Sequence, residues 1–149
     1  CFLCTMCVLC SFTLSAKDVD GKKTTDMSFG LTADDTNLIW NPAPDFLPGC
    51  TFTILHGDMS EPNLDIFFKI PANTIAAKHW HHSAERMLLV KGELEVTYDG
   101  EQSETFKAGT YLYGPAKKPH KVKCLDSWPC LLFIALAEPF DAFLIVEKN

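Results

Sequence analysis

Short runs of β-forming residues, each ended by turn residues, fill most of the sequence after residue 50. The predicted strands are Thr51–His56, Leu64–Ile70, Arg86–Val90, Glu93–Tyr98, Glu104–Lys107, Tyr111–Tyr113, His120–Cys124, Cys130–Ala135 and Ala142–Val146. The clearest turn is Asp99-Gly100, a pair that strongly favours a hairpin. No stretch keeps a 3.6-residue hydrophobic period, so we expect little helix. Many short, evenly spaced strands predict an all-β sandwich or small barrel.

Length and composition narrow the class of protein. The chain has 149 residues, which is the size of one ordinary domain. It is 47% hydrophobic and 21% charged, the composition of a folded globular protein. Lys and Arg number 13 against 19 Asp and Glu, a net charge of −6. This acidic balance argues against a nucleic-acid partner, because binding phosphates requires clustered positive charge.

The first 16 residues carry no charge. Cys1–Ala16 is apolar with interspersed Ser and Thr, and it is shorter than the roughly 20 residues that a membrane-spanning helix needs. The segment fits the apolar part of a secretory signal with a cut near Ala16; a short membrane anchor or a mis-called start are the alternatives. We therefore expect a leader over 1–16, a single domain over 17–149, and a mature protein without a membrane span in the bacterial periplasm or outside the cell.

The cysteines form two groups. The N-terminal ones recur every third residue, at Cys1, Cys4, Cys7 and Cys10. Their apolar spacers, and Ser11 in place of the expected Pro, argue against an iron–sulfur cluster. Of the remaining three, Cys124 and Cys130 flank a turn and could pair in an oxidising compartment. Two separate buried thiols are the favoured interpretation.

Chemistry-bearing residues concentrate in the stretch His79-Trp80-His81-His82-Ser83-Ala84-Glu85. Alternation along a strand places His79 and His81 on one face, and Glu85 keeps this parity if the strand continues. His120 begins a later strand. Imidazoles and a carboxylate are ligands that suit iron(II), manganese, zinc, nickel or copper, and the lack of a Cys in the set disfavours a thiolate site.

These residues resemble the two sequence motifs of the cupin superfamily. The first motif has Gly, His-x-His, Glu and Gly, and His79, His81, Glu85 and Gly92 stand at those spacings, with Asn73-Thr74 in the region of the leading Gly. In the second, Gly109, Pro115 and His120 match, whereas Lys117 replaces a Gly and Cys124 replaces an Asn. No metal ligand is lost by these departures.

The resemblance extends over about Trp40 to Ile145. Trp40–Pro44, Leu47–Gly49, Leu55–Asp58 and Lys69–Ala72 are similar to segments of small bacterial single-domain cupins, which often carry a signal peptide and a His-Trp-His metal strand. It implies a double-stranded β-helix, or jelly-roll barrel, with its core over about 51–147, preceded by an irregular N-terminal strap. It also implies one divalent metal ion (Fe, Zn, Mn or Ni) on His79, His81, Glu85 and His120.

Several side chains are candidates for the wall of a pocket beside the metal. The inward-facing candidates are Phe68, Met87, Tyr111, Tyr113 and Phe133, and Cys124 shares the parity of His120. A Tyr near a metal can act as an acid or base, so Tyr111 and Tyr113 are the candidate catalytic residues. His82 has the opposite parity and is expected to be exposed. Trp80 is expected to face away from the metal and pack on the strap.

Cupins host very different chemistries, so the resemblance specifies the reaction less well than the fold. We expect a metalloenzyme acting on a small organic molecule, with dioxygenase-like chemistry if the ion is iron. Zinc, manganese or nickel would favour lyase, isomerase or decarboxylase chemistry. The alternative is a non-catalytic cupin that binds a metal or a small ligand as a sensor or carrier. Cupins commonly pair through sheet edges or exchanged N-terminal strands, so the resemblance implies a homodimer.

Overall fold

The computed structural model describes residues 28–146. The predicted leader over 1–16 and its four cysteines lie outside the described residues. Residues Leu31–Asn149 form one compact unit. Every regular element within the described residues is a β-strand, so the expected all-β class is confirmed. Among these residues no helix has the length and apolarity to cross a membrane.

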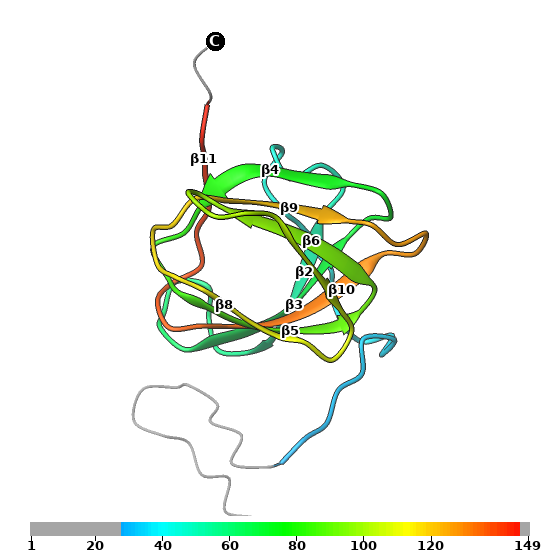
Figure 1. Ribbon diagram of the computed structural model, residues 1–149. Helices are drawn as coiled ribbons and strands as arrows, with labels where there is room; N and C mark the ends of the chain where they lie inside the picture. Colours follow the sequence, from blue (N-terminus) through cyan, green and yellow to red (C-terminus); the bar gives the residue numbers. More distant parts are fainter. Residues whose placement is uncertain (1–27, 147–149) are drawn as a thin grey trace, which may run out of the picture. The chain divides into compact units, whose positions relative to one another are not determined.

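Two antiparallel sheets face each other around a common interior (Figure 1). The six-stranded sheet has the order β1-β2-β3-β10-β5-β8, and the five-stranded sheet has the order β11-β4-β9-β6-β7. The strands are β1 (Asn41–Pro42), β2 (Thr51–His56), β3 (Leu64–Ile70), β4 (Ile75–Trp80), β5 (Glu85–Lys91), β6 (Glu93–Tyr98), β7 (Glu104–Lys107), β8 (Tyr111–Gly114), β9 (His120–Cys124), β10 (Cys130–Leu136) and β11 (Phe143–Leu144). This is the jelly-roll barrel that the sequence predicts.

Most strand predictions agree with the structure to within one residue at each end, and three segments differ. Strand β4 was not among the predicted strands, although alternation along a strand was expected for His79 and His81. Strand β1 lies inside the Pro-rich lead-in, where it pairs with β2 although an irregular strap was expected. Strand β11 is shorter than the predicted Ala142–Val146 and pairs with β4. Both short strands sit at sheet edges, where a Pro such as Pro42 is tolerated because its missing N–H can face solvent.

The core lies between the sheets, and strand periodicity explains which residues fill it. Strand β3 alternates strictly, with Leu64, Ile66, Phe68 and Ile70 buried and the residues between them half-buried. Strand β10 lies between β3 and β5 in the middle of its sheet, and it contributes Leu132, Ile134 and Leu136 to the same cluster. Each such side chain contributes about 1.5–3 kcal/mol through burial.

One cross-link joins the two sheets. Cys124, the last residue of β9, forms a disulfide with Cys130, the first residue of β10. The favoured prediction of two separate thiols was therefore wrong for this pair. Gly92 provides the room: its φ is +99°, and a Cβ there would lie 2.7 Å from Cys130 Sγ. Cys50 remains a free thiol, and burial raises its pKa to about 11.

Candidate metal centre

The four predicted ligands reach one place in the barrel from three strands and a turn. His79 lies in β4 and pairs with His120, which begins β9 in the same sheet. His81 follows the end of β4 at Trp80. The chain then crosses to the other sheet, where Glu85 begins β5. Glu85 thus arrives from the opposite sheet rather than by continued alternation along one strand, as the sequence had suggested.

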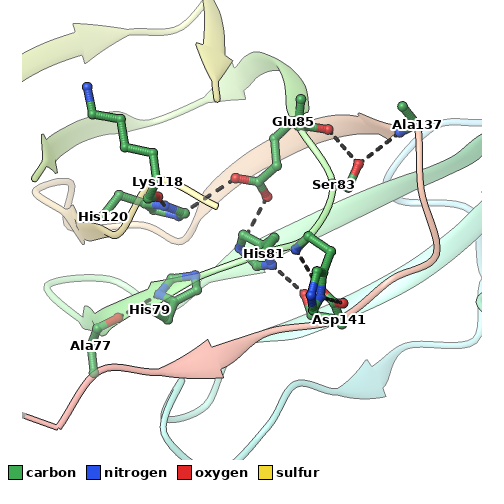
Figure 2. Close-up of polar contacts among 11 residues, drawn as sticks. Ala77, His79, His81, Ser83, Glu85, Lys118, His120, Ala137 and Asp141 are labelled. Atoms are coloured by element: carbon green, nitrogen blue, oxygen red, sulfur yellow. Dashed lines mark hydrogen bonds and ion pairs between the residues drawn. The ribbon is translucent and has the colours of Figure 1, made fainter. Parts of the chain in front are cut away.

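The three imidazoles form a compact buried cluster. Their ligand atoms all lie within 4.8 Å of one another. His79, His81 and His120 are 5%, 8% and 5% exposed, respectively. Figure 2 shows the rings converging beside the carboxylate of Glu85. Buried imidazoles at this spacing, without polar partners for their inner nitrogens beyond one carboxylate, match the donor set of a divalent transition-metal site.

Backbone carbonyls orient all three rings. The Nδ1 atom of His79 lies 2.6 Å from the carbonyl oxygen of Ala77, and that of His120 lies 3.2 Å from the carbonyl of Lys118. The Nδ1 atom of His81 contacts the carbonyl of Asp141. A carbonyl can only accept, so each ring carries its proton on Nδ1 and leaves the Nε2 lone pair free. This arrangement is how proteins prepare histidines as metal ligands.

Glu85 closes the cluster. Its two carboxylate oxygens lie 3.5 Å from His81 Nε2 and 3.7 Å from His120 Nε2 (Figure 2). The residue is 7% exposed, and this burial raises the pKa of the carboxyl above its usual value. Burial also lowers the pKa of His79 to about 4, and burial together with the neighbouring imidazoles lowers the pKa of His120 to about 3. A bound dication would favour the ionised carboxylate and the neutral imidazoles, so the donor set fits a metal ion.

A buried serine fixes the turn that carries Glu85. Ser83 is 2% exposed and its Oγ donates to the carbonyl of Ala84 at 2.7 Å (Figure 2). The same oxygen accepts from the backbone N–H groups of Ala137 and Glu138, at 2.9 and 3.2 Å. The turn between β4 and β5 is therefore tied to the chain that leaves β10. Sequence reasoning gave Ser83 no role.

The two departures that fall at Gly positions of the cupin motifs preserve the backbone conformation. Lys117, where the second motif has a Gly, adopts φ +62°, and Asn73, near the leading Gly of the first motif, adopts φ +54°. Both take the left-handed conformation that Gly accepts most easily. The N–H of Lys117 also donates to the carbonyl of His81 at 2.7 Å. The turn before His120 therefore forms without its Gly, and it contacts the metal cluster directly.

A cavity adjoins the four ligands. Its remaining wall consists of apolar side chains, which are Leu47, Phe68, Ile70, Ala76, Met87, Val122, Leu132, Ile134, Phe140 and Ala142. Two of the expected pocket residues, Phe68 and Met87, thus stand in this wall. Phe140 and Ala142 flank Asp141 on the C-terminal segment that ends in β11, a part of the wall that the sequence had not suggested.

The other expected pocket residues lie elsewhere. Tyr111 and Tyr113 are 62% and 56% exposed, because β8 turns Leu112 and Gly114 inward instead; they contact a second cavity between β6, β7 and β8. Phe133 is half-buried on the outer side of β10, between the inward-facing Leu132 and Ile134. Cys124 is buried in the disulfide and does not line the metal cavity.

The tyrosine nearest to the cluster is Tyr98, which sequence reasoning missed. Its ring lies 5.2 Å from that of His120, and its buried hydroxyl has no hydrogen-bond partner among the described residues. A Cβ at Gly114 would lie 2.7 Å from this hydroxyl and 3.3 Å from Glu85 Oε2, so the glycine makes room for both groups. Burial and the carboxylates of Glu85 and Glu101 raise the pKa of Tyr98. A signal was available, since Tyr98 shares the strand parity of Leu94 and Val96.

Trp80 and His82, at the end of β4 and just after it, were both expected to face away from the metal cluster. His82 is exposed, as predicted, and its Nδ1 and N–H bond the carboxylate of Asp141 at 2.7 and 2.9 Å. Trp80 was expected to pack on the N-terminal strap, and the structure shows its ring against a different segment. It stacks on Phe143 of β11, with ring centroids 4.5 Å apart. The sequence could not reveal this contact because the pairing of β11 with β4 joins distant segments.

Comparison with known proteins places the chain among cupins. Residues 30–138 match the family model described as "ChrR Cupin-like domain". No curated protein sequence matches the chain. The match to the family model covers both motifs and all four candidate ligands.

Several solved structures share the fold. DMSP lyase DddQ from Ruegeria pomeroyi DSS-3 superposes with a TM-score of 0.61 at 18% identity, over 72% of this chain and 60% of that one. A formate complex of oxalate decarboxylase from Lactobacillus farciminis gives 0.59 at 21% identity, over 73% of this chain and 34% of that one. KdgF from Halomonas sp. gives 0.55 at 17% identity, over 67% and 88%. The chain therefore spans less than two thirds of the first two proteins, and at these identities the likeness concerns the fold.

Proposed function

The chain belongs to the family of ChrR cupin-like domains, and on that premise we propose that it is a metal-dependent enzyme acting on a small organic molecule. His79, His81 and His120 would hold one divalent transition-metal ion, with Glu85 beside it as a fourth ligand. The observation that carries this proposal is the orientation of the three buried rings, each with Nδ1 bonded to a backbone carbonyl and Nε2 free. The substrate would occupy the adjoining apolar cavity.

The chain's own residues supply binding, orientation and a proton-accepting group. Apolar side chains exclude water from the cavity and hold the body of the substrate against the cluster. Glu85 could accept or donate a proton at a carboxylate oxygen that does not bind the ion, and burial raises its pKa above the usual value. When bound, iron would supply oxygen chemistry, and zinc, manganese or nickel would act as a Lewis acid. Dioxygenase-like turnover is our leading version of the proposal.

A second candidate is a sensor or carrier without turnover. The observation that favours it is the lack, in the described wall of the cavity, of any polar side chain other than the four ligands. Most enzymes place further acid, base or anion-stabilising groups around the reacting atoms. The two candidates share the metal site and differ only in whether a bound molecule is converted.

Elemental analysis of protein purified without added metal tests the shared part. We expect close to one equivalent of a transition metal per chain; a near-zero content that added Fe²⁺, Zn²⁺, Mn²⁺ and Ni²⁺ fail to raise would contradict the proposal. Oxygen-uptake assays with small thiols, diketones, phenols and organic acids then separate the candidates. Consumption of oxygen supports the dioxygenase version. Ligand-dependent stabilisation without turnover of any compound supports the sensor or carrier.

Two further parts of the proposal concern location and assembly. The disulfide between Cys124 and Cys130 supports export, because disulfides persist in oxidising compartments such as the bacterial periplasm. The edge strands β7 and β8 support pairing of two copies through a sheet edge. Light scattering on the protein eluting from a size-exclusion column measures the mass directly, and a monomer at all concentrations would contradict the dimer.

A further inference from the structure

The wall of the metal cavity has an unusual composition for a substrate pocket. Apart from His79, His81, Glu85 and His120, every side chain that lines it is aliphatic, aromatic or a thioether. Within the described residues, no hydroxyl, amide, carboxylate or ammonium group of a side chain is available in this wall to a second polar group of a ligand. A second polar group on a ligand would lose its hydrating water here without gaining a hydrogen-bond partner, which would weaken the binding of that ligand.

Among the described residues, no cationic side chain lines this wall. The sequence holds a single arginine, Arg86, and it is exposed on the outer side of β5. The two lysines that precede His120 also lie outside this wall. Lys118 bonds the carboxylate of Glu101, and Lys117 is outside the set of lining residues. A substrate with a second carboxylate would therefore find no positively charged side chain in the cavity.

Charge and size restrict the ligand further. Three neutral imidazoles and one carboxylate around a dication leave one net positive charge, which favours an anionic head group on the ligand. The cavity is small, with a volume of about 40 Å³. A ligand that fits without displacing the wall therefore has only a few non-hydrogen atoms beyond its head group.

We propose that the molecule bound here has one anionic, metal-binding head group, such as a carboxylate or thiolate, and a short apolar tail without a second polar group. This substrate class rests on the proposed metal-dependent function and deepens it. It excludes amino acids, other zwitterions and short sugars as good ligands. The reason is that, among the described residues, the four ligands supply the only polar side chains in the wall, so the head group uses all the polar side-chain recognition there.

Three molecules of nearly equal shape test the proposal. Butyrate, 3-hydroxypropionate and β-alanine share a carboxylate and differ only in a terminal methyl, hydroxyl or ammonium group. Their affinities are measured on Co²⁺-loaded protein, by calorimetry and by the change in the visible Co²⁺ spectrum. We expect butyrate to bind tightest, 3-hydroxypropionate about tenfold more weakly, and β-alanine at least a hundredfold more weakly. The metal-free protein is expected to bind butyrate at least tenfold more weakly than the loaded protein.

Each outcome separates this inference from the function on which it rests. Failure to bind Co²⁺ or Zn²⁺ overturns both. If the metal binds but β-alanine or 3-hydroxypropionate matches butyrate, the substrate class is wrong and the metal site stands. Propanethiol repeats the test with a thiol head, and if neither butyrate nor propanethiol binds the loaded protein, the substrate class is likewise wrong.

A matched pair of variants tests the role of the wall itself. Ala142 is half-buried in the C-terminal segment of the wall. Ala142→Asp adds a negative charge there, and Ala142→Asn adds a side chain of the same size without the charge. We expect Ala142→Asp to reduce the preference for butyrate over β-alanine at least tenfold and Ala142→Asn to leave it within about threefold. An equal preference in both variants would overturn the assignment of this wall to the ligand's tail.

Discussion

Strand β9 begins with His120 and ends with Cys124, and the barrel is held together differently around these two residues. Around His120, three imidazoles and a carboxylate are buried beside one another. Around Cys124, a disulfide ties β9 to β10 among apolar side chains. The first region buries polar groups, which costs stability and which a cation would offset under the proposed function, whereas the second adds stability without regard to any ligand.

The difference shows where the sequence serves function rather than folding. A stable barrel would fill the His120 region with apolar residues, as it does around Cys124. Buried, unpaired polar groups persist in folded proteins mainly where a ligand or a reaction uses them. The contrast therefore yields four predictions, since each region can be perturbed separately.

The largest expected effect is on metal binding. His120→Ala or His79→Ala removes one of three converging imidazoles, and we expect the affinity for Zn²⁺ or Co²⁺ to fall at least a hundredfold. Metal content and competition with a chromogenic chelator measure this loss. His82→Ala is the matched control, because His82 is exposed and bonds Asp141 rather than the cluster. A comparable loss of affinity in His82→Ala would show that the three-histidine cluster is not the site.

The metal-free protein should also respond to pH through this region. His79 and His120 have pKa values of about 4 and 3 in the folded protein, below the usual 6.5, because burial disfavours their charged form. Unfolding then takes up protons as the pH falls below about 6.5, so these histidines lower the unfolding free energy on acidification. Glu85 acts oppositely: burial raises its pKa above 4.5, so its contribution is lost as the pH rises through that raised pKa.

The two histidines predict that metal-free protein loses stability as the pH falls below about 6.5. Unfolding takes up protons at the two histidines, and Glu85 releases one between its usual and its raised pKa, which offsets part of that uptake. Glu85→Gln removes the release and should steepen the acid side. Denaturant titrations of both proteins between pH 4.5 and 8 measure the slopes. A flat profile in metal-free protein, or identical slopes in the variant, would contradict the assigned burial of these charges.

The third prediction concerns the disulfide. Its two cysteines are six residues apart, and closing so short a loop in the unfolded chain stabilises the folded state by about 2–3 kcal/mol. We expect Cys124→Ser/Cys130→Ser to lower the unfolding free energy by this amount and to leave the affinity for Zn²⁺ within about threefold. A reductant should destabilise the original chain and not the variant. A large loss of metal affinity in the variant would mean that the two regions are not independent.

The sequence predicted those features that depend on neighbouring residues better than those that depend on contacts between distant segments. The turn at Asp99-Gly100 and the alternation of β3 and β6 are local, so their strands were predicted to the residue. The ligands carried motif spacing, and the structure brings all of them together. The disulfide depended on which sheets β9 and β10 join, and the sequence showed only that a turn lies between them.

The errors at the pocket come from short strands with ambiguous phase. In Tyr111-Leu112-Tyr113-Gly114 either alternate pair can face inward, and the pattern of residue types does not decide between two tyrosines and a Leu-Gly pair. The structure turns the glycine inward because Tyr98 and Glu85 occupy the space that a side chain would need. This constraint comes from residues of strands β5 and β6, so the sequence next to residue 111 does not contain it.

The smallest expected effect is on the unfolding free energy when Tyr98 is changed. Tyr98 belongs to the His120 region, because its ring lies against that of His120. Tyr98→Phe removes a buried hydroxyl that has no partner among the described residues and leaves its ring against His120. Since an unpaired buried hydroxyl is costly, the variant should gain about 1 kcal/mol in unfolding free energy. Tyr111→Phe is the control, because Tyr111 is 62% exposed and should change stability by less than about 0.5 kcal/mol.

A gain of unfolding free energy in Tyr98→Phe would show that this hydroxyl, like the polar groups beside Glu85, destabilises the metal-free barrel. A loss of stability would instead show that the hydroxyl is bonded in solution, and the contrast between the two regions would then apply to the four ligands alone. Denaturant unfolding of metal-free protein distinguishes these outcomes. Repeating the unfolding experiment with Zn²⁺ tests whether the ion changes the cost of burying the Tyr98 hydroxyl. A cation beside Glu85 would change the electrostatic potential at this hydroxyl.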